Sequence, residues 1–289
     1  MRIHPLCLPC LLNRVYYEAK LATSDPRILD KCMELALNTL NEKYSKKPVN
    51  THLATEIHRK VYEILKCDPY AEKKKFANEI SAKLLPFIEK IVEKSKDKFR
   101  AAVKASIVGN EFDFGVSGHK VFESFDYLLD HFLKRIGEDL AIDHVEKLKE
   151  LVDGTVVYIT DNAGEIFLDT ILMKEIKKRC SKLTVIVKAR PILSDATIED
   201  AKLAGVDKIA DEILTNGKGA IGILFEELPN DVLSKIEEAE LIIAKGMANY
   251  ECLSESNFKP VAFLLTAKCE PVANSLGVKR GDMVAKVVE

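Results

Sequence analysis

The 289-residue sequence lacks several features that define large classes of proteins. It has no Trp and no Gln, and its longest apolar runs, such as residues 260–267, are far shorter than the ~18 apolar residues of a membrane span. It also has no excess of one charge, because 43 Lys and Arg face 45 Asp and Glu. Without a basic surface field, nucleic acids and anionic membranes are poor partners. We therefore expect no nucleic-acid partner and no membrane attachment.

A disulfide pattern and an export signal are also missing. The seven cysteines are odd in number and scattered, which does not indicate a disulfide framework. The first five residues lack the basic, apolar and small-residue order of a signal peptide, so we expect a cytoplasmic location. Abundant Lys and Glu together with the absence of Gln are typical of heat-adapted proteins and indicate a thermophile.

What is present describes a globular protein of about two domains, with 47 % hydrophobic and 30 % charged residues. In residues 1–150 the apolar side chains recur at intervals of three and four residues, as they do along one face of a helix. The expected helices cover residues 8–22, 26–44, 51–66, 70–96, 98–107, 120–136 and 141–151. Pro86 is expected to kink or divide the fourth of these. We predict an all-helical domain over residues 1–150, serving as a cap or for dimerisation, which leaves a homo-oligomer open.

From residue 154 onward, β-branched runs alternate with helical segments. The expected strands cover residues 155–160, 183–189, 212–215, 241–244 and 261–266. The expected helices cover residues 164–178, 197–204, 221–228 and 231–239. This alternation predicts an α/β domain over residues 151–289, with an open, mostly parallel sheet between two helical layers, a three-layer αβα arrangement. In such sheets ligands bind outside the carboxyl ends of the strands.

Polar side chains gather directly after these expected strands. Asp161 and Asn162 follow the first strand and Asp195 follows the second. Two carboxylates and a carboxamide oxygen suit Mg, Mn or another borderline divalent ion. Simpler roles are also open, since Asp161 and Asn162 could form an Asx turn and Asp195 could cap a helix. The other polar residues after strands are Glu165, Arg190, Lys218, Lys245, Asn249, Glu251, Lys268 and Glu270. Together they predict a site for a metal and a phosphate.

Two loop segments have open interpretations. Residues 217–222 match G-x-G-x-x-G, but they follow the third expected strand rather than the first. A plain Gly-rich loop is therefore favoured over a dinucleotide site. Residues 109–115 form either a simple turn between helices or a segment that leans over the open end of the sheet.

Cys7 and Cys10 form a C-x-x-C pair without a second pair at zinc-ribbon spacing. Two thiolates are half of a tetrahedral metal site. Completing that site would require one or more of His4, His58, Cys32 and Cys67. A disulfide and two buried free thiols are the other interpretations of Cys7 and Cys10.

Several motifs combine into a pattern that covers essentially the whole chain. They are Cys7-x-x-Cys10 with Leu11 and Arg14, Asp68-Pro69-Tyr70 with Lys74 and Asn78, Gly109-Asn110-x-x-Asp113, Asp161-Asn162-Ala163-Gly164-Glu165, Arg190-Pro191-x-x-x-Asp195-Ala196-Thr197, Lys245-Gly246-x-x-Asn249-Tyr250-Glu251 and Lys268-Cys269. In these motifs the sequence resembles the metal-dependent damage-control phosphatases, a family also described as acidic-residue-methyltransferase-like. The C-x-x-C pair suggests the stand-alone archaeal and bacterial branch of that family.

The resemblance implies a helical domain packed on an α/β domain, and hydrolysis of phosphomonoesters of small metabolites such as sugar phosphates, nucleotides or phosphopantetheine-like compounds. It implies a divalent metal cofactor, Mn, Co, Ni or Mg. By matching positions, Asp161, Asn162 and Asp195 would hold the metal, and Lys268 would contact the phosphate during catalysis. The positions implied for substrate binding are Asn110, Asp113, Glu165, Arg190, Lys245, Gly246, Asn249 and Glu251, of which Arg190 and Lys245 could instead be structural.

Other mechanisms and functions stay open at this point. The phosphoryl group could be attacked by water or pass through a covalent intermediate on Asp161. The family's second name raises an S-adenosylmethionine-dependent carboxyl methyltransferase, although no glycine-rich loop of the usual form follows the first expected strand. A non-catalytic metal- or nucleotide-binding protein is the third alternative.

Overall fold

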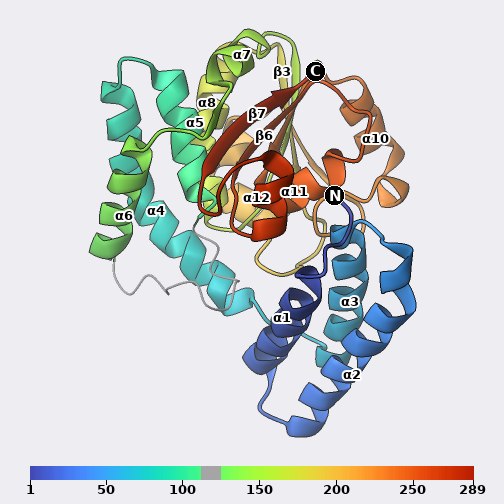
Figure 1. The fold of residues 1–289 in the computed structure, drawn as a ribbon. Helices are drawn as coiled ribbons and strands as arrows, with labels where there is room; N and C mark the ends of the chain where they lie inside the picture. The colour runs from blue at the N-terminus through green and yellow to red at the C-terminus, as the bar shows by residue number, and fades with distance from the viewer. Residues whose placement is uncertain (112–124) are drawn as a thin grey trace.

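The computed structural model describes residues 1–111 and 125–289, and a mixed sheet forms the centre of this part of the chain (Figure 1). Within the described residues the sheet has seven strands in the order β1-β7-β6-β5-β2-β3-β4. Their bounds are β1 (Ile142–Asp143), β2 (Thr155–Ile159), β3 (Lys182–Val187), β4 (Glu212–Thr215), β5 (Leu241–Lys245), β6 (Val261–Thr266) and β7 (Met283–Val288). Strands β6 and β7 are antiparallel, and the other neighbouring pairs are parallel. The predicted mostly parallel sheet is confirmed.

The central strands are apolar on both faces because helices cover both sides of the sheet. In β2, Val156 and Tyr158 belong to one hydrophobic core, and Val157 and Ile159 belong to the other. A parallel sheet covered on both faces requires such a continuous apolar run. Strand β2 also lies where the chain order reverses, with β3 and β4 on one side and β5 and β6 on the other. At such a point the loops diverge and leave room for a ligand at the carboxyl ends.

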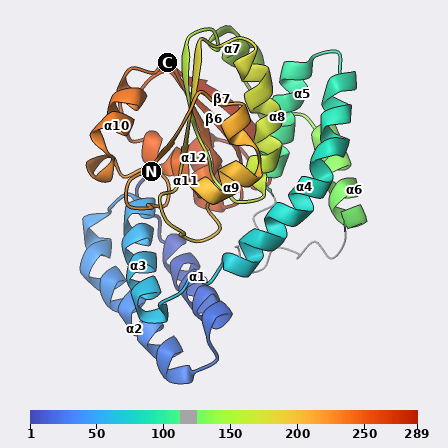
Figure 2. The ribbon, with the colours of Figure 1, turned by 180° about the vertical axis from the view of Figure 1, so that it is seen from behind.

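Two layers of helices enclose the sheet (Figures 1 and 2). One layer contains α4 (Ala71–Lys94), α5 (Lys98–Gly109), α6 (Phe125–Gly137), α7 (Val145–Glu150), α8 (Glu165–Lys177) and α9 (Ile198–Leu203). The other contains α10 (Asn230–Glu237), α11 (Gly246–Leu253) and α12 (Glu270–Leu276). The predicted three-layer arrangement is therefore confirmed. No helix in the described ranges is long and apolar enough to cross a membrane.

The first three helices form a lobe beyond the sheet (Figure 1). The lobe consists of α1 (Cys7–Ala22), α2 (Pro26–Lys43) and α3 (Asn50–Leu65), and it has a hydrophobic core of its own. Ile192, Leu193 and Ile221, from loops after β3 and β4, are also part of that core. The lobe is therefore seated on the loops at the carboxyl ends of the strands.

The later helices of the N-terminal half pack on the sheet layer instead. Buried residues of α4 and α5 share one core with β2, β3 and α8. At the closest approach of α5 and α8, a Cβ added to Gly109 would lie 3.2 Å from Leu168 Cβ, so a larger residue would push the helices apart. Strand β1 also comes from this half of the chain. The division into domains at residue 150 stays a prediction.

Two of the expected helices are wrong in detail. Residues 142–143 of the expected helix 141–151 pair with β7, and α7 begins only at Val145. Most of the expected helix 221–228 is loop, with a single 3-10 turn over Phe225–Glu227. Pro86 lies inside α4 without dividing it. Strand β7 and helices α11 and α12 were not expected, and the two helices are short and begin beside Gly, Pro or charged residues.

Candidate functional site

The loops after β2 and β3 bring the three expected metal ligands together. Asn162 and Asp195 face each other across an isolated antiparallel bridge. The amide of Ala163 donates to the carbonyl of Ser194, and the amide of Ala196 donates to the carbonyl of Asp161, both at 2.8 Å. Asp161, Asn162 and Asp195 are all buried. The backbone therefore fixes the two loops against each other and gathers the trio in one place.

Two carboxamides hold the Asp161 side chain. Asn162 Nδ2 donates to Asp161 Oδ2 at 2.9 Å and to Glu165 Oε2 at 3.0 Å. Asn110, which caps the C-terminus of α5, donates to the same two oxygens at 2.9 Å. Asn162 Oδ1 in turn accepts a hydrogen bond from Ser194 Oγ at 2.8 Å. These bonds join α5, the start of α8 and the loop after β3 around one carboxylate.

Gly246 closes the site from the β5 side. Its φ of +74° lies in the left-handed region that glycine adopts without strain. A Cβ at this position would overlap the carboxylate oxygen Oδ2 of Asp161. The backbone between β5 and α11 thus fits directly against Asp161, and only glycine can occupy the position without displacing that carboxylate.

Lys245 lies in a fully buried ionic network under the site. Its Nζ donates to Glu165 Oε1 and Asp169 Oδ1, both at 2.6 Å, and to the carbonyl of Ser106 at 3.0 Å. Burial raises the pKa of Asp169, Lys245 opposes the rise and the charge of Glu165 adds to it, and together they bring the pKa to about 6. Burial alone would lower the pKa of Lys245, but the two carboxylates raise it above its usual value. All three ammonium protons of Lys245 are donated to groups of the protein, which favours a structural role for Lys245 over substrate binding.

Helix α11 places two further expected residues, Asn249 and Glu251, in different surroundings. Asn249 Nδ2 donates to the carbonyls of Thr160 and Lys245, at 3.0 and 2.7 Å, and so ties α11 to the ends of β2 and β5. Glu251 lies at the lobe, where its Oε2 accepts from Asn50 Nδ2 at 2.9 Å. Burial raises the pKa of Glu251 to about 7, although Asn50 and the chain's amino group oppose the shift.

The remaining expected residues lie around the rim or outside the described ranges. Lys268 follows β6 in a half-buried position, where its amide donates to Met247 Sδ at 3.3 Å. Arg190 is exposed, and its backbone packs against Gly219. Asp113 lies outside the described residues.

Cys7 and Cys10 are free thiols, the first buried and the second exposed. Burial raises the pKa of the Cys7 thiol, and the nearby charge of Glu251 adds to the effect. His58, one of the candidate partners in a zinc site, is instead paired with Glu18 at 2.7 Å. Within residues 1–111 and 125–289, no three His, Cys, Asp or Glu side chains gather in a metal-binding group.

Three residues that support the trio had no role predicted from the sequence, although Asn78 belongs to one of the quoted motifs. Lys188, at the end of β3, is buried with Nζ 3.4 Å from Asp195 Oδ2 and donates to the carbonyl of Gly222 at 2.8 Å. Asn78 of α4 accepts from the amide of Gly164 at 2.8 Å. Ser194 holds Asn162, as described above. A lysine closing an otherwise apolar strand was the signal that could have identified Lys188.

The residues present fit a divalent cation. The trio supplies two carboxylates and a carboxamide, which are hard oxygen donors, and all three side chains are buried. Because the trio includes no His or Cys, it suits Mg or Mn better than a closed zinc site.

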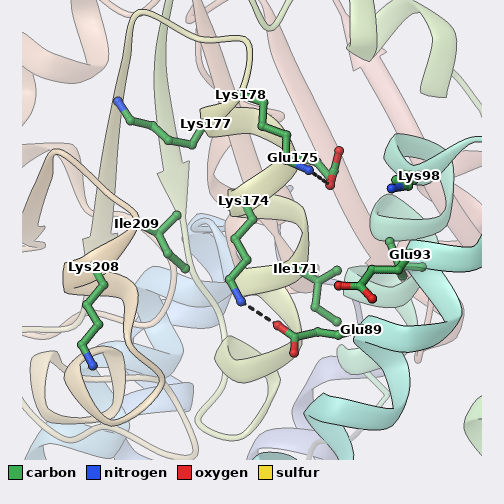
Figure 3. A pocket seen from close by; sticks show the side chains of 11 residues that line it. Glu89, Glu93, Lys98, Ile171, Lys174, Glu175, Lys177, Lys178, Lys208 and Ile209 are labelled. Atoms are coloured by element: carbon green, nitrogen blue, oxygen red, sulfur yellow. Dashed lines mark hydrogen bonds and ion pairs between the residues drawn. The ribbon is translucent and has the colours of Figure 1, made fainter.

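A hollow lies near the C-terminal end of α8, where its lining residues are drawn in Figure 3. It is lined by the last turns of α8 and by α4, whereas the trio lies at the first turn of α8. Two of its lysines pair with neighbouring carboxylates, Lys174 with Glu89 at 2.6 Å and Lys178 with Glu175. These paired charges do not form a centre for a metal and a phosphate, so this hollow is not a candidate for such a site.

Comparisons with known proteins show to which family the chain belongs. The family described as damage-control phosphatase ARMT1-like domain matches residues 3–284. A damage-control phosphatase of Archaeoglobus fulgidus is 62 % identical over 290 residues, covering 100 % of both chains. A damage-control phosphatase of Pyrococcus horikoshii is 33 % identical and covers 98 % of this chain and 97 % of its own. The crystal structure of a DUF89 family protein from Pyrococcus horikoshii is 32 % identical, with a TM-score of 0.91 and 99 % of each chain covered.

Proposed function

We propose that this chain, which belongs to the ARMT1-like damage-control phosphatase family, hydrolyses phosphomonoesters of small metabolites at the ends of β2 and β3. The observation that carries the proposal is the buried trio of Asp161, Asn162 and Asp195, joined across the two loops and enclosed by Gly246. A metal-dependent phosphatase of this family needs a hard-ligand site, and this trio supplies one.

The trio would hold the divalent ion, with Mn, Co, Ni and Mg as the candidates. When bound, such an ion neutralises charge on a phosphoryl oxygen and makes a nearby water more acidic. The protein's part is orientation. Asn110 and Asn162 donate to Asp161 Oδ2, and Ser194 fixes the Asn162 amide, so the carboxylate direction is set before substrate arrives.

Lys268 would contact the phosphate from the rim of the site. It follows β6, whose carboxyl end lies at the same edge of the sheet as that of β2, so its ammonium is on the side of the trio. Lys245 has a different role in this proposal, because its three protons are used by Ser106, Glu165 and Asp169. It supplies the positive charge that allows two carboxylates to be buried beneath the site.

The proposal is tested by hydrolysis of p-nitrophenyl phosphate with each of the four metals, before and after chelation. We expect activity that EDTA removes and that added Mn, Co, Ni or Mg restores. Asp161→Ala and Asp195→Ala should each lower kcat/KM by at least about 100-fold. Asp30→Ala, a change at an exposed position on α2, is the matched control.

Full activity in either trio variant, or activity that a chelator does not affect, would contradict the proposal. Because the strand-end geometry does not define the leaving group, a screen of sugar phosphates, nucleotides and phosphopantetheine should follow with the most active metal. A cytoplasmic location stays a prediction.

A further inference from the structure

Helix α3 connects the N-terminal lobe to several loops at the strand ends. Its contacts run along one side of the helix: Asn50 to Glu251, Thr51 to Cys252, Thr55 to the amide of Ile221, Arg59 to the carbonyl of Gly219 and Tyr62 to the amide of Leu193. One of these contacts leads directly to the proposed metal site, because Leu193 is two residues before Asp195.

Leu193 has a backbone conformation that needs external support. Its φ is +49°, in the left-handed region that a branched side chain rarely adopts. The side chain is buried in the lobe core, and the amide donates to the hydroxyl of Tyr62 at 2.9 Å. Such a conformation is sustained only when surrounding contacts over-determine it.

The turn at Leu193 sets the position of the residues that follow it. Ser194 donates to Asn162 Oδ1 at 2.8 Å, and its carbonyl accepts from the amide of Ala163. Asp195 then lies opposite Asn162 in the antiparallel bridge. A rotation at Leu193 would therefore move one proposed metal ligand and release a second one.

Tyr62 is suited to hold this turn. It lies on α3, whose neighbouring side chains Ile57 and Val61 are fully buried in the lobe core. Burial, together with the charges of Glu18 and Asp68, raises the pKa of the Tyr62 phenol well above its usual value. The hydroxyl therefore stays neutral at physiological pH and keeps a lone pair for the Leu193 amide.

We propose that Tyr62 is a positioning residue for the metal site, because its hydroxyl holds the left-handed turn at Leu193 that presents Ser194 and Asp195 to Asn162 and Asp161. This inference rests on the proposed function of the trio. It assigns to the lobe a part in metal binding, although no lobe side chain belongs to the trio.

The test compares two changes on the same helix. Tyr62→Phe removes the hydroxyl and keeps the ring, and Thr51→Val removes a hydroxyl that contacts Cys252 of α11, away from the metal loop. Calorimetric titration of the chelator-treated proteins with Mn²⁺ should show about tenfold weaker binding for Tyr62→Phe, the lower end of the usual effect of a residue behind a metal ligand. For Thr51→Val, affinity should stay within about twofold of wild type, as expected for a change without a shared partner.

A kinetic comparison separates positioning from general damage. Tyr62→Phe should need about tenfold more Mn²⁺ for half-maximal hydrolysis of p-nitrophenyl phosphate, yet approach the wild-type kcat at saturating metal. Equal Mn²⁺ affinity in Tyr62→Phe and Thr51→Val would overturn the inference while leaving the proposed function intact. Wild-type protein that neither binds Mn²⁺ nor hydrolyses the ester would instead overturn the proposed function.

Hydrogen exchange on the wild-type protein tests the same link without a substitution. If α3 and the metal loop are coupled, Mn²⁺ should slow amide exchange both in residues 190–197 and in α3 around Tyr62, because coupling is reciprocal. Protection confined to the loop, with α3 unchanged, would contradict the role of Tyr62 even if the Tyr62→Phe protein failed to fold.

Discussion

The two sides of Asp161 use a buried lysine in different ways. On the β5 side, Lys245 is fully buried, and its three protons are donated to a carbonyl and two carboxylates at 2.6–3.0 Å. On the β3 side, Lys188 donates to one carbonyl and lies 3.4 Å from Asp195. The β5 side is therefore a closed ionic network, whereas the β3 side pairs a cation loosely with a proposed metal ligand. The difference indicates that the first lysine stabilises the fold and the second balances the ligand's charge.

Replacement of Lys245, the lysine on the β5 side, should cause the largest loss of stability. Lys245→Met leaves Glu165 and Asp169 buried without their counter-charge, and breaking such a pair costs about 3–5 kcal/mol. Urea unfolding monitored by circular dichroism measures the loss. Lys178→Met, at an exposed ion pair with Glu175, is the control and should change stability by less than about 0.5 kcal/mol. If Lys245→Met lowered the free energy of unfolding by less than about 1 kcal/mol, Lys245 would not stabilise the fold as its closed network indicates.

Glu251, which is buried where α11 meets the lobe, tests whether a buried carboxylate lowers the stability of the protein at neutral pH. Its pKa rises from 4.5 to about 7 on folding, so between these values the folded protein keeps a proton that the unfolded chain releases. Stability contributed by this group is present below pH 4.5 and is lost as the pH rises through 7. Glu251→Gln should therefore be more stable than wild type by roughly 3 kcal/mol at pH 8 and equal to it at pH 4.

Thermal unfolding across this pH range measures the Glu251→Gln difference. Glu63→Gln, at an exposed position of α3, reports the general effect of removing one carboxylate. A constant difference between Glu251→Gln and wild type from pH 4 to pH 8 would show that Glu251 does not titrate with folding.

Replacement of Lys188, the lysine on the β3 side, should cause a smaller loss of stability, which added metal should reverse. Lys188→Met leaves Asp195 without its neighbouring cation, which should cost the metal-free protein about 1–3 kcal/mol. Added Mn²⁺ should stabilise this variant more than wild type, because the metal replaces the missing positive charge. Unfolding midpoints with and without Mn²⁺ measure both effects. Equal stabilisation of the two proteins by Mn²⁺ would place Lys188 in a purely structural role.

Part of this site could be predicted from the sequence because parallel strands end at one edge. The exits of β2 and β3 place Asp161, Asn162 and Asp195 together by topology alone, and the structure brings these three into contact. The same reasoning could not show that Lys245 and Asn249 hold the fold together rather than bind substrate. Their partners, Asp169 and the carbonyl of Thr160, are identified only when α8 and α11 are packed.

The supports from other elements had no local signal. Tyr62 looks like an ordinary residue of an amphipathic helix, and its partner Leu193 lies 131 positions away. The left-handed turn at Leu193 is equally hidden, since glycine would be the usual indication of it. Strand β1 has two residues, too few to show any alternation, so helical periodicity in its surroundings dominated the prediction.

The edge formed by β1 and β7 has a consequence for the order of folding. Ile142 pairs with Val284, and β7 is inserted between β1 and β6, so this edge joins distant parts of the chain. Contacts of such long sequence separation form slowly because a large loop must first be closed. The lobe, whose helices follow one another directly, can form early from local contacts. Until β7 is in place, β1 has no strand to pair with among the described residues, and completion of this edge should come late in folding.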